Sequence, residues 1–285
     1  MKRIRISHLT EYNYAAQVTF GPHRVMIRPR EGHDVHIESS TLQINPASRV
    51  RWIRDMYGNS IANITFQAAA TQLRIFSEVV VDHFDENPLD FVIAPEAVSY
   101  PFRYGLDEQP ELIPYRLSSY PNDGEALAEW LLEFYKPGQL IGTFDLLAKL
   151  NRSIHENFTY ARREEQGIQL PSYTLATRTG SCRDFAALMM EAGRFWGFGA
   201  RFVTGYLQTP IEQGQHGATH AWTEFYIPGA GWRGFDPTNN KYAGAQHVSV
   251  AVARDPQKAA PVSGSWQGTP NSFLGMNVNI QVIPL

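Results

Sequence analysis

Hydrophobic and polar positions alternate along the first part of the chain, as they do in a strand with one buried face. Between residues 4 and 14, one parity carries Ile4, Ile6, His8, Thr10, Tyr12 and Tyr14. This alternation predicts a half-buried strand. Shorter segments of the same kind lie at 24–27, 36–44, 49–54, 61–67 and 73–82, with turn residues between them. We therefore expect residues 1–85 to form an antiparallel β domain, a sandwich or a curled sheet, with a hairpin turn at 55–59.

The next segment, residues 86–123, is dense in proline. Its prolines are Pro88, Pro95, Pro101, Pro110, Pro114 and Pro121. Proline opposes both a helix interior and a central strand, because it lacks the backbone N–H and fixes φ. The segment is therefore predicted to be a linker.

The spacing of apolar residues then changes to the period of a helix. Helices are expected at 124–135, at 143–157 and from Phe185 to a glycine at 197 or 199. Strand patterns follow at 201–207, 221–227, 232–236, 248–252 and 276–282. Helices followed by an antiparallel meander predict an α+β fold. Residues 124–285 are accordingly expected to form one core that includes the C-terminal strands.

Composition and charge narrow the classes of function. The chain has 285 residues, 43% of them hydrophobic, and a net charge of −3. This charge provides no field that would favour nucleic acid or an anionic membrane, so neither is an expected partner. No signal-like apolar run is visible and Cys182 is the only cysteine, which favours a cytoplasmic location.

Cys182 lies where a loop turns into the predicted helix, in the sequence Gly180-Ser181-Cys182. Free backbone N–H groups and the dipole at the start of a helix favour a thiolate. The same N–H groups could stabilise the oxyanion that forms when a thiolate attacks a carbonyl. The position is therefore suited to a nucleophile.

His220 and Asp236 lie on two strands that a short loop joins. If residues 228–230 form that loop, Trp222 faces Asp236 and His220 faces Thr238. His220 and Asp236 then become diagonal neighbours on one face of the sheet, about 7 Å apart between backbones and within reach of each other's side chains. This register predicts a Cys-His-Asp arrangement if Cys182 meets the pair.

Structural interpretations compete with each of these assignments. A lone cysteine is usually a small buried hydrophobe, His220 could be a strand residue that satisfies its hydrogen bonds, and Asp236 could form a turn before Pro237. Asp184 is expected to interact with the helix dipole, and Trp222 to belong to the core. The pairs His33/His36 and His216/His220 lack metal-site context, and no phosphate or dinucleotide fingerprint occurs. No metal or cofactor is therefore expected.

Several motifs together resemble the bacterial transglutaminase-like cysteine enzymes. They are the Gly180–Ala186 segment, the 200–207 strand, His220-Ala221-Trp222 and Asp236-Pro237-Thr238. Further similarity lies in Arg28-Pro29-Arg30, in Asp55-x-x-Gly58-Asn59 and in the tail from residue 250. Ala253-Arg254-Asp255-Pro256 departs from the family pattern, in which a glycine often precedes the arginine.

The resemblance implies a papain-like core after an N-terminal β domain, with Cys182 as nucleophile, His220 as base and Asp236 as the residue that orients it. It implies acyl transfer on an amide or peptide bond through a thioester, with a protein or peptide as substrate, and it favours hydrolysis over transamidation. A non-catalytic binding module that keeps the fold is the alternative. A redox-sensing thiol ranks last, because the chain has no second cysteine. The oligomeric state is left open.

Overall fold

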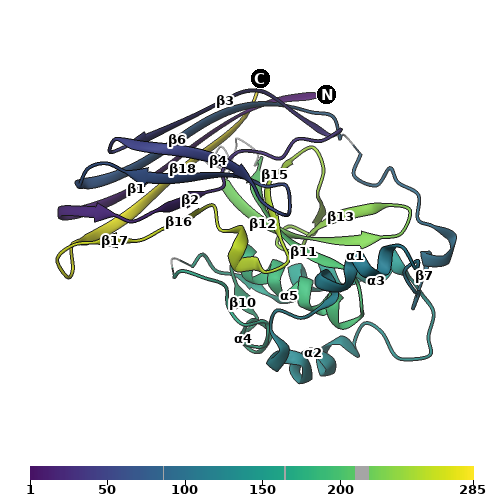
Figure 1. Ribbon diagram of the computed structural model, residues 1–285. Coiled ribbons are helices and arrows are strands. Elements are labelled where there is room, and N and C mark those ends of the chain that lie inside the picture. The colour runs from purple at the N-terminus through teal and green to yellow at the C-terminus, as the bar shows by residue number, and fades with distance from the viewer. Residues whose placement is uncertain (86, 164, 209–217) are drawn as a thin grey trace.

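The computed structural model describes residues 1–85, 87–163, 165–208 and 218–285. In Figure 1 a β sandwich occupies one side of the molecule, and a unit of helices around a second group of strands occupies the other. The sheets are mostly antiparallel and the helices cluster in the second unit. The predicted α+β class is therefore confirmed.

The β sandwich is built from two sheets. The first has the order β17-β1-β6-β3, with β18 also paired to β1. Its strands are β1 (Lys2–Phe20), β3 (Val35–Asn45), β6 (Ala70–His83), β17 (Trp266–Gln267) and β18 (Phe273–Pro284). The second has the order β16-β2-β5-β4, with β2 (His23–Val25), β4 (Ser48–Arg54), β5 (Ser60–Phe66) and β16 (Val262–Ser263). The inner face of each sheet contributes apolar residues to one core, including Ile64 and Ile75.

The hairpin turn expected at 55–59 is present between β4 and β5. Arg54 pairs with Ser60 across it, and the Asp55 N–H donates to the carbonyl of Asn59 at 3.2 Å. Gly58 has a φ of +75°, which a residue with a Cβ rarely adopts. The strand pattern of the first 85 residues thus gives the expected elements.

The C-terminal strands belong to the sandwich, not to the core unit in which the sequence placed them. β18 runs along β1 from the pair Ile4/Pro284 to the pair Tyr14/Phe273, and Figure 1 shows the two chain ends side by side. β16 and β17 pair with β2 and β1. Alternation identifies a strand but not its partner, so the sequence could not assign these strands to a sheet.

The proline-rich segment contains regular structure, which corrects the expectation of a plain linker. It includes η1 (Pro95–Ala97), β7 (Ser99–Tyr100), α1 (Glu108–Arg116) and η2 (Pro121–Asp123). Pro110 is tolerated because it lies in the first turn of α1, where the N–H groups have no helical partner. Near the end of α1, Arg254 Nε donates to the carbonyl of Pro114 at 2.7 Å and Arg194 Nε to that of Tyr115 at 2.9 Å. Tertiary contacts therefore hold a helix that its sequence disfavours.

The core unit surrounds one central helix. Its helices are α2 (Gly124–Leu131), α3 (Thr143–Asn157), α4 (Pro171–Thr177), α5 (Cys182–Phe195) and the short η4 (Pro256–Ala259). Its main sheet, in the order β14-β13-β12-β11-β15, contains β11 (Ala200–Leu207), β12 (Ala218–Ile227), β13 (Gly231–Asp236), β14 (Lys241–Tyr242) and β15 (His247–Ala253). The short strands β8 (Ile141–Gly142), β9 (Thr159–Tyr160) and β10 (Thr179–Gly180) complete the unit.

Helix α5 is buried from Asp184 to Arg194 and packs against β12. A Cβ on Gly193 would lie 2.0 Å from Cε1 of Phe225, so glycine is required where the helix approaches the strand. The predicted boundaries hold for α3, while α2 and α5 end earlier than expected.

Buried polar contacts fix the sandwich against the core sheet. The amide of Asn59 donates to the carbonyl of Val252 at 2.8 Å and accepts from its N–H at 2.9 Å. The buried hydroxyl of Tyr206 lies 2.8 Å from His8 Nδ1 and donates to the carbonyl of Ile27 at 3.1 Å. These bonds hold the sandwich in one place relative to β11 and β15. None of the helices in the described part of the chain is long and apolar enough to cross a membrane.

Candidate active site

Cys182 is the first residue of α5 and is partly exposed. The preceding residues are held by parallel pairing of β10 with β9, in which Thr179 faces Thr159 and Gly180 faces Tyr160. A Cβ on Gly180 would come within 2.9 Å of the Asp184 Cβ, so a glycine lets the loop approach the helix. The chain thus enters α5 with the partly exposed Cys182 at the helix N-terminus.

The carboxylate of Asp184 is fully engaged in holding the start of α5. Its Oδ2 accepts from the N–H and the hydroxyl of Ser181 at 2.8 and 2.7 Å. Its Oδ1 accepts from Arg163 Nη1 and from the N–H of Gln169, both at 2.8 Å. Burial alone would raise the pKa of Asp184, but these donors outweigh it and lower the pKa. The structural role expected for Asp184 agrees with this geometry.

His220 and Asp236 are in contact, as the predicted register of β12 and β13 requires. Ile227 pairs with Gly231 and Thr223 with Phe235, which places Trp222 opposite Asp236, as predicted. The ring Nε2 of His220 donates to Asp236 Oδ2 at 2.8 Å, and both side chains are buried. The thiol of Cys182 lies within hydrogen-bonding reach of the same ring. Since Nε2 is used by Asp236, Nδ1 is the nitrogen left to face the sulfur.

The pair favours a charged imidazole. Burial by itself would lower the pKa of His220, but the Asp236 carboxylate and the neighbouring sulfur raise it to about 10. Burial would likewise raise the pKa of Asp236, whereas His220 and His247 hold it well below its usual range. A positive imidazolium beside Cys182 is the setting in which a cysteine acts as a nucleophile.

Two further side chains, His247 and Asn239, bind Asp236 and were not identified from the sequence. His247 Nε2 donates to Asp236 Oδ2 at 3.1 Å, and Asn239 Nδ2 donates to the same oxygen at 2.8 Å. The pKa of His247 is lowered by burial, which favours a neutral ring. Asn239 could have been suspected from its place three residues after Asp236, a spacing typical of turn contacts. His247 carries no such signal, because its position depends on the pairing of β15 with β11.

Tyr160 was also missed. Burial and the nearby Cys182 both raise the pKa of its phenol, yet half of the residue is exposed. It belongs to β9, next to the loop that leads into α5. Tyr160 is therefore close enough to Cys182 for the two groups to influence each other electrostatically.

The ligating atoms of His220, Asp236 and His247 all lie within 4.8 Å of one another. This spacing could suit a divalent cation, but both imidazole Nε2 atoms donate to the carboxylate oxygen that the ion would use. The arrangement therefore fits a hydrogen-bonded cluster better than a metal site. Of the other histidines considered as ligands, His33 and His36 are in the sandwich, and His216 lies outside the described residues.

Two family models match separate parts of the chain. Residues 4–82 match the bacterial transglutaminase-like N-terminal region, and residues 141–237 match the transglutaminase-like superfamily. The matched ranges together cover more than half of the chain, and the second contains Cys182, His220 and Asp236. The chain belongs to the bacterial transglutaminase-like family. Its transglutaminase-like core is thus the part that carries the cysteine, histidine and aspartate cluster.

Relatives of this transglutaminase-like protein share its whole length. An uncharacterized protein of Mycobacterium tuberculosis is 27% identical over 300 residues, which covers 99% of this chain and 93% of that protein. One from Mycobacterium leprae is 25% identical over 285 residues, covering 98% and 99%. A solved structure from Cytophaga hutchinsonii, described as a candidate cysteine protease, superimposes with a TM-score of 0.74 at 19% identity and covers 100% of this chain and 91% of that one. The last comparison confirms the fold.

Proposed function

We propose that the protein is a cysteine-dependent acyl-transfer enzyme that acts on amide or peptide bonds through a thioester. The observation that carries the proposal is the buried hydrogen bond between His220 and Asp236 at 2.8 Å, formed beside Cys182 at the start of α5. The family match supports a cysteine enzyme, and the side chains supply the groups that this chemistry requires.

The first half of the reaction forms the acyl-enzyme. The Cys182 thiolate adds to the carbonyl carbon, and backbone N–H groups at the start of α5 stabilise the oxyanion. The C–N bond then breaks as His220 gives its Nδ1 proton to the leaving amine. Asp236 keeps the imidazole oriented, while His247 and Asn239 act as positioning residues for Asp236.

The second half resolves the thioester. His220 removes a proton from the incoming nucleophile, whose oxygen or nitrogen attacks the acyl carbon, and the C–S bond breaks to return Cys182 as a thiolate. Water gives hydrolysis and an amine gives transamidation. We place hydrolysis first, supported by the description of the Cytophaga hutchinsonii structure as a candidate cysteine protease. A protein or peptide is the proposed substrate.

The test is a screen of peptide and glutamine-containing substrates in H2¹⁸O, with and without a primary amine, followed by mass spectrometry. The proposal expects a Cys182-linked acyl adduct, and ¹⁸O in the released acid if water is the acceptor. Incorporation of the amine in place of ¹⁸O would assign transamidation. Saturable binding with no product that depends on Cys182 would support the alternative of a non-catalytic binding module.

A further inference from the structure

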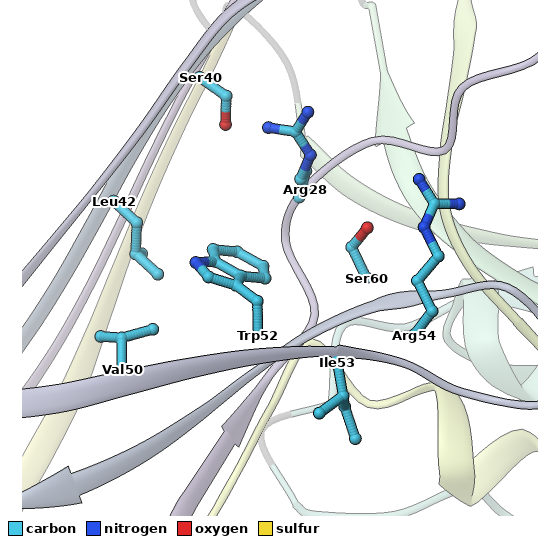
Figure 2. Close-up of a pocket in the computed structure, with 8 residues that line it drawn as sticks. All are labelled: Arg28, Ser40, Leu42, Val50, Trp52, Ile53, Arg54 and Ser60. Carbon is cyan, nitrogen blue, oxygen red and sulfur yellow. The ribbon is translucent and has the colours of Figure 1, made fainter.

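A groove of about 530 Å³ opens in the β sandwich between the edge strands β3 and β4. Figure 2 shows the Trp52 ring in the middle of this groove, with Leu42 on one side and Arg28 and Ser60 on the other. Trp52 is 47% exposed. None of the residues that line the groove belongs to the Cys182 cluster, so the groove is a separate feature of the molecule.

Several residues that line the groove lie on the inward-facing parity of their strands, where the sandwich core is expected. Along β4, Val50 packs against the inner core, and Trp52 and Arg54 follow it on the same parity. Along β5, Ser60 has the parity of the core residues Ala62 and Ile64. Inward positions normally carry aliphatic side chains. Here Trp52, Arg54 and Ser60 replace them, and a groove takes the place of the apolar core.

Positive charge gathers around the groove. β4 contains Arg49, Arg51 and Arg54 and no acidic residue. Within the described residues Arg54 makes no ion pair, and Arg28 makes one, with Glu31 at 3.4 Å on the surface. Guanidinium groups with free donors bind carboxylates in bidentate geometry. The charge therefore favours an anionic ligand that also presents apolar side chains to Trp52.

Both strands at the mouth of the groove have an unpaired edge. In the described part of the chain, β3 pairs only with β6 and β4 only with β5. An exposed strand edge offers backbone donors and acceptors to an added strand. An extended polypeptide could therefore use these groups while its alternate side chains point into the groove.

We propose that the groove between β3 and β4 binds an extended acidic segment of a polypeptide. Acidic side chains of that segment pair with Arg28 and Arg54, and an aliphatic or aromatic side chain packs on Trp52. This binding does not require Cys182 to react, so it stands independently of the proposed catalysis. If the enzyme acts on proteins, the groove selects those that carry such a segment.

The test uses a synthetic peptide of alternating Glu and Val residues. Its binding to the full chain is measured by Trp fluorescence and by calorimetry. R28E/R54E should weaken the affinity by about tenfold or more, since two charge-assisted contacts become repulsive. R49E/R51E makes the same change in net charge on the other parity of β4 and should have a much smaller effect. W52A should also weaken binding, and C182A should bind like the wild type.

Three results would overturn the assignment. The first is equal loss of affinity in R28E/R54E and R49E/R51E, which would indicate a general charge effect. The second is equally tight binding of the peptide with Lys in place of Glu. The third is binding of a single-stranded oligonucleotide as tight as that of the acidic peptide, with the same dependence on Arg28 and Arg54. All variants should keep the wild-type circular dichroism, because none of the replaced side chains is fully buried.

Discussion

His247 Nε2 lies 3.1 Å from Asp236 Oδ2, the oxygen that also binds His220. The Asp236 carboxylate thus accepts hydrogen bonds from two imidazoles, and the Asn239 amide is a third side-chain donor at 2.8 Å. His247 is in turn fixed by His83, whose Nε2 donates to the His247 carbonyl at 3.2 Å. The orientation of Asp236 is therefore set partly by the sandwich, through the contact between His83 and His247.

The first prediction concerns this positioning role. H247L should lower kcat by about tenfold, the equivalent of one lost hydrogen bond, with little change in KM. H247Q should recover most of the loss, since a glutamine amide can place a donor near the position of Nε2. Steady-state kinetics with a peptide substrate provides the measurement. Equal activity of the leucine and glutamine variants would show that His247 only fills space.

The second prediction tests the nucleophile and its base. C182A should abolish turnover, to below about a thousandth of the wild-type rate, because no other group can form the thioester. H220A should slow both turnover and alkylation of Cys182 by iodoacetamide, since the imidazolium that stabilises the thiolate is gone. H155A, which removes a histidine whose ring hydrogen-bonds the carbonyl of Thr238, serves as control. Unchanged alkylation in H220A would contradict the proposed mechanism.

The third prediction concerns the alkaline limb of the pH profile. Amine release needs a protonated His220, whose pKa is raised to about 10, so kcat/KM should fall as the pH rises toward that value. Burial lowers the pKa of His220 and the Asp236 carboxylate raises it. Because D236N removes that charge, this limb should move to lower pH. E38Q changes an exposed carboxylate in the sandwich and should leave the limb in place. Identical profiles for D236N and wild type would exclude the pairing as its cause.

The fourth prediction follows from the same pKa through linkage. His220 binds its proton more tightly in the folded chain, so its contribution to stability is complete below about pH 6.5 and is lost as the pH rises to about 10. The difference in free energy of unfolding between wild type and H220A should therefore shrink over that interval. Urea unfolding at several pH values measures it. A difference that grows with pH would reverse the assigned sign.

The fifth prediction concerns the contact between the sandwich and the core sheet. Asn59 is 1% exposed and makes two hydrogen bonds to the backbone of Val252. N59A should lower the free energy of unfolding by about 2–3 kcal/mol, because it leaves buried backbone groups unsatisfied. N63A, at a partly exposed position of β5, the strand that follows Asn59, should have a much smaller effect. Chemical denaturation of both variants makes the comparison.

Local patterns were enough to predict much of this structure. The strands of the sandwich, the boundaries of α3 and the register that brings His220 to Asp236 all depend on interactions close in sequence. Trp222, expected in the core, packs with Val203 and Val252. The catalytic roles of Cys182, His220 and Asp236 remain predictions that the geometry supports.

What the sequence could not predict depends on contacts between distant residues. α1 exists because Arg194 and Arg254 bind its last carbonyls, and no local pattern in a proline-rich segment reports them. The place of His247 beside Asp236 follows from the order of strands in a sheet. The partner of β18 lies at the opposite end of the chain. In each case the deciding interaction is tertiary, so helix or strand periodicity cannot predict it.

The pairing of β1 with β18 has a consequence for how the protein is made. β1 is synthesised long before its neighbour β18, so this sheet cannot be completed until the core between the two strands has also been made. The transglutaminase-like core is in effect an insertion between two halves of one sheet. A gene fragment that encodes only residues 1–85 would leave one side of β1 unpaired, and a fragment that encodes only residues 124–285 would carry β18 without its partner. Exchange of the sandwich as a module therefore requires the segments that encode β1 and β18 together.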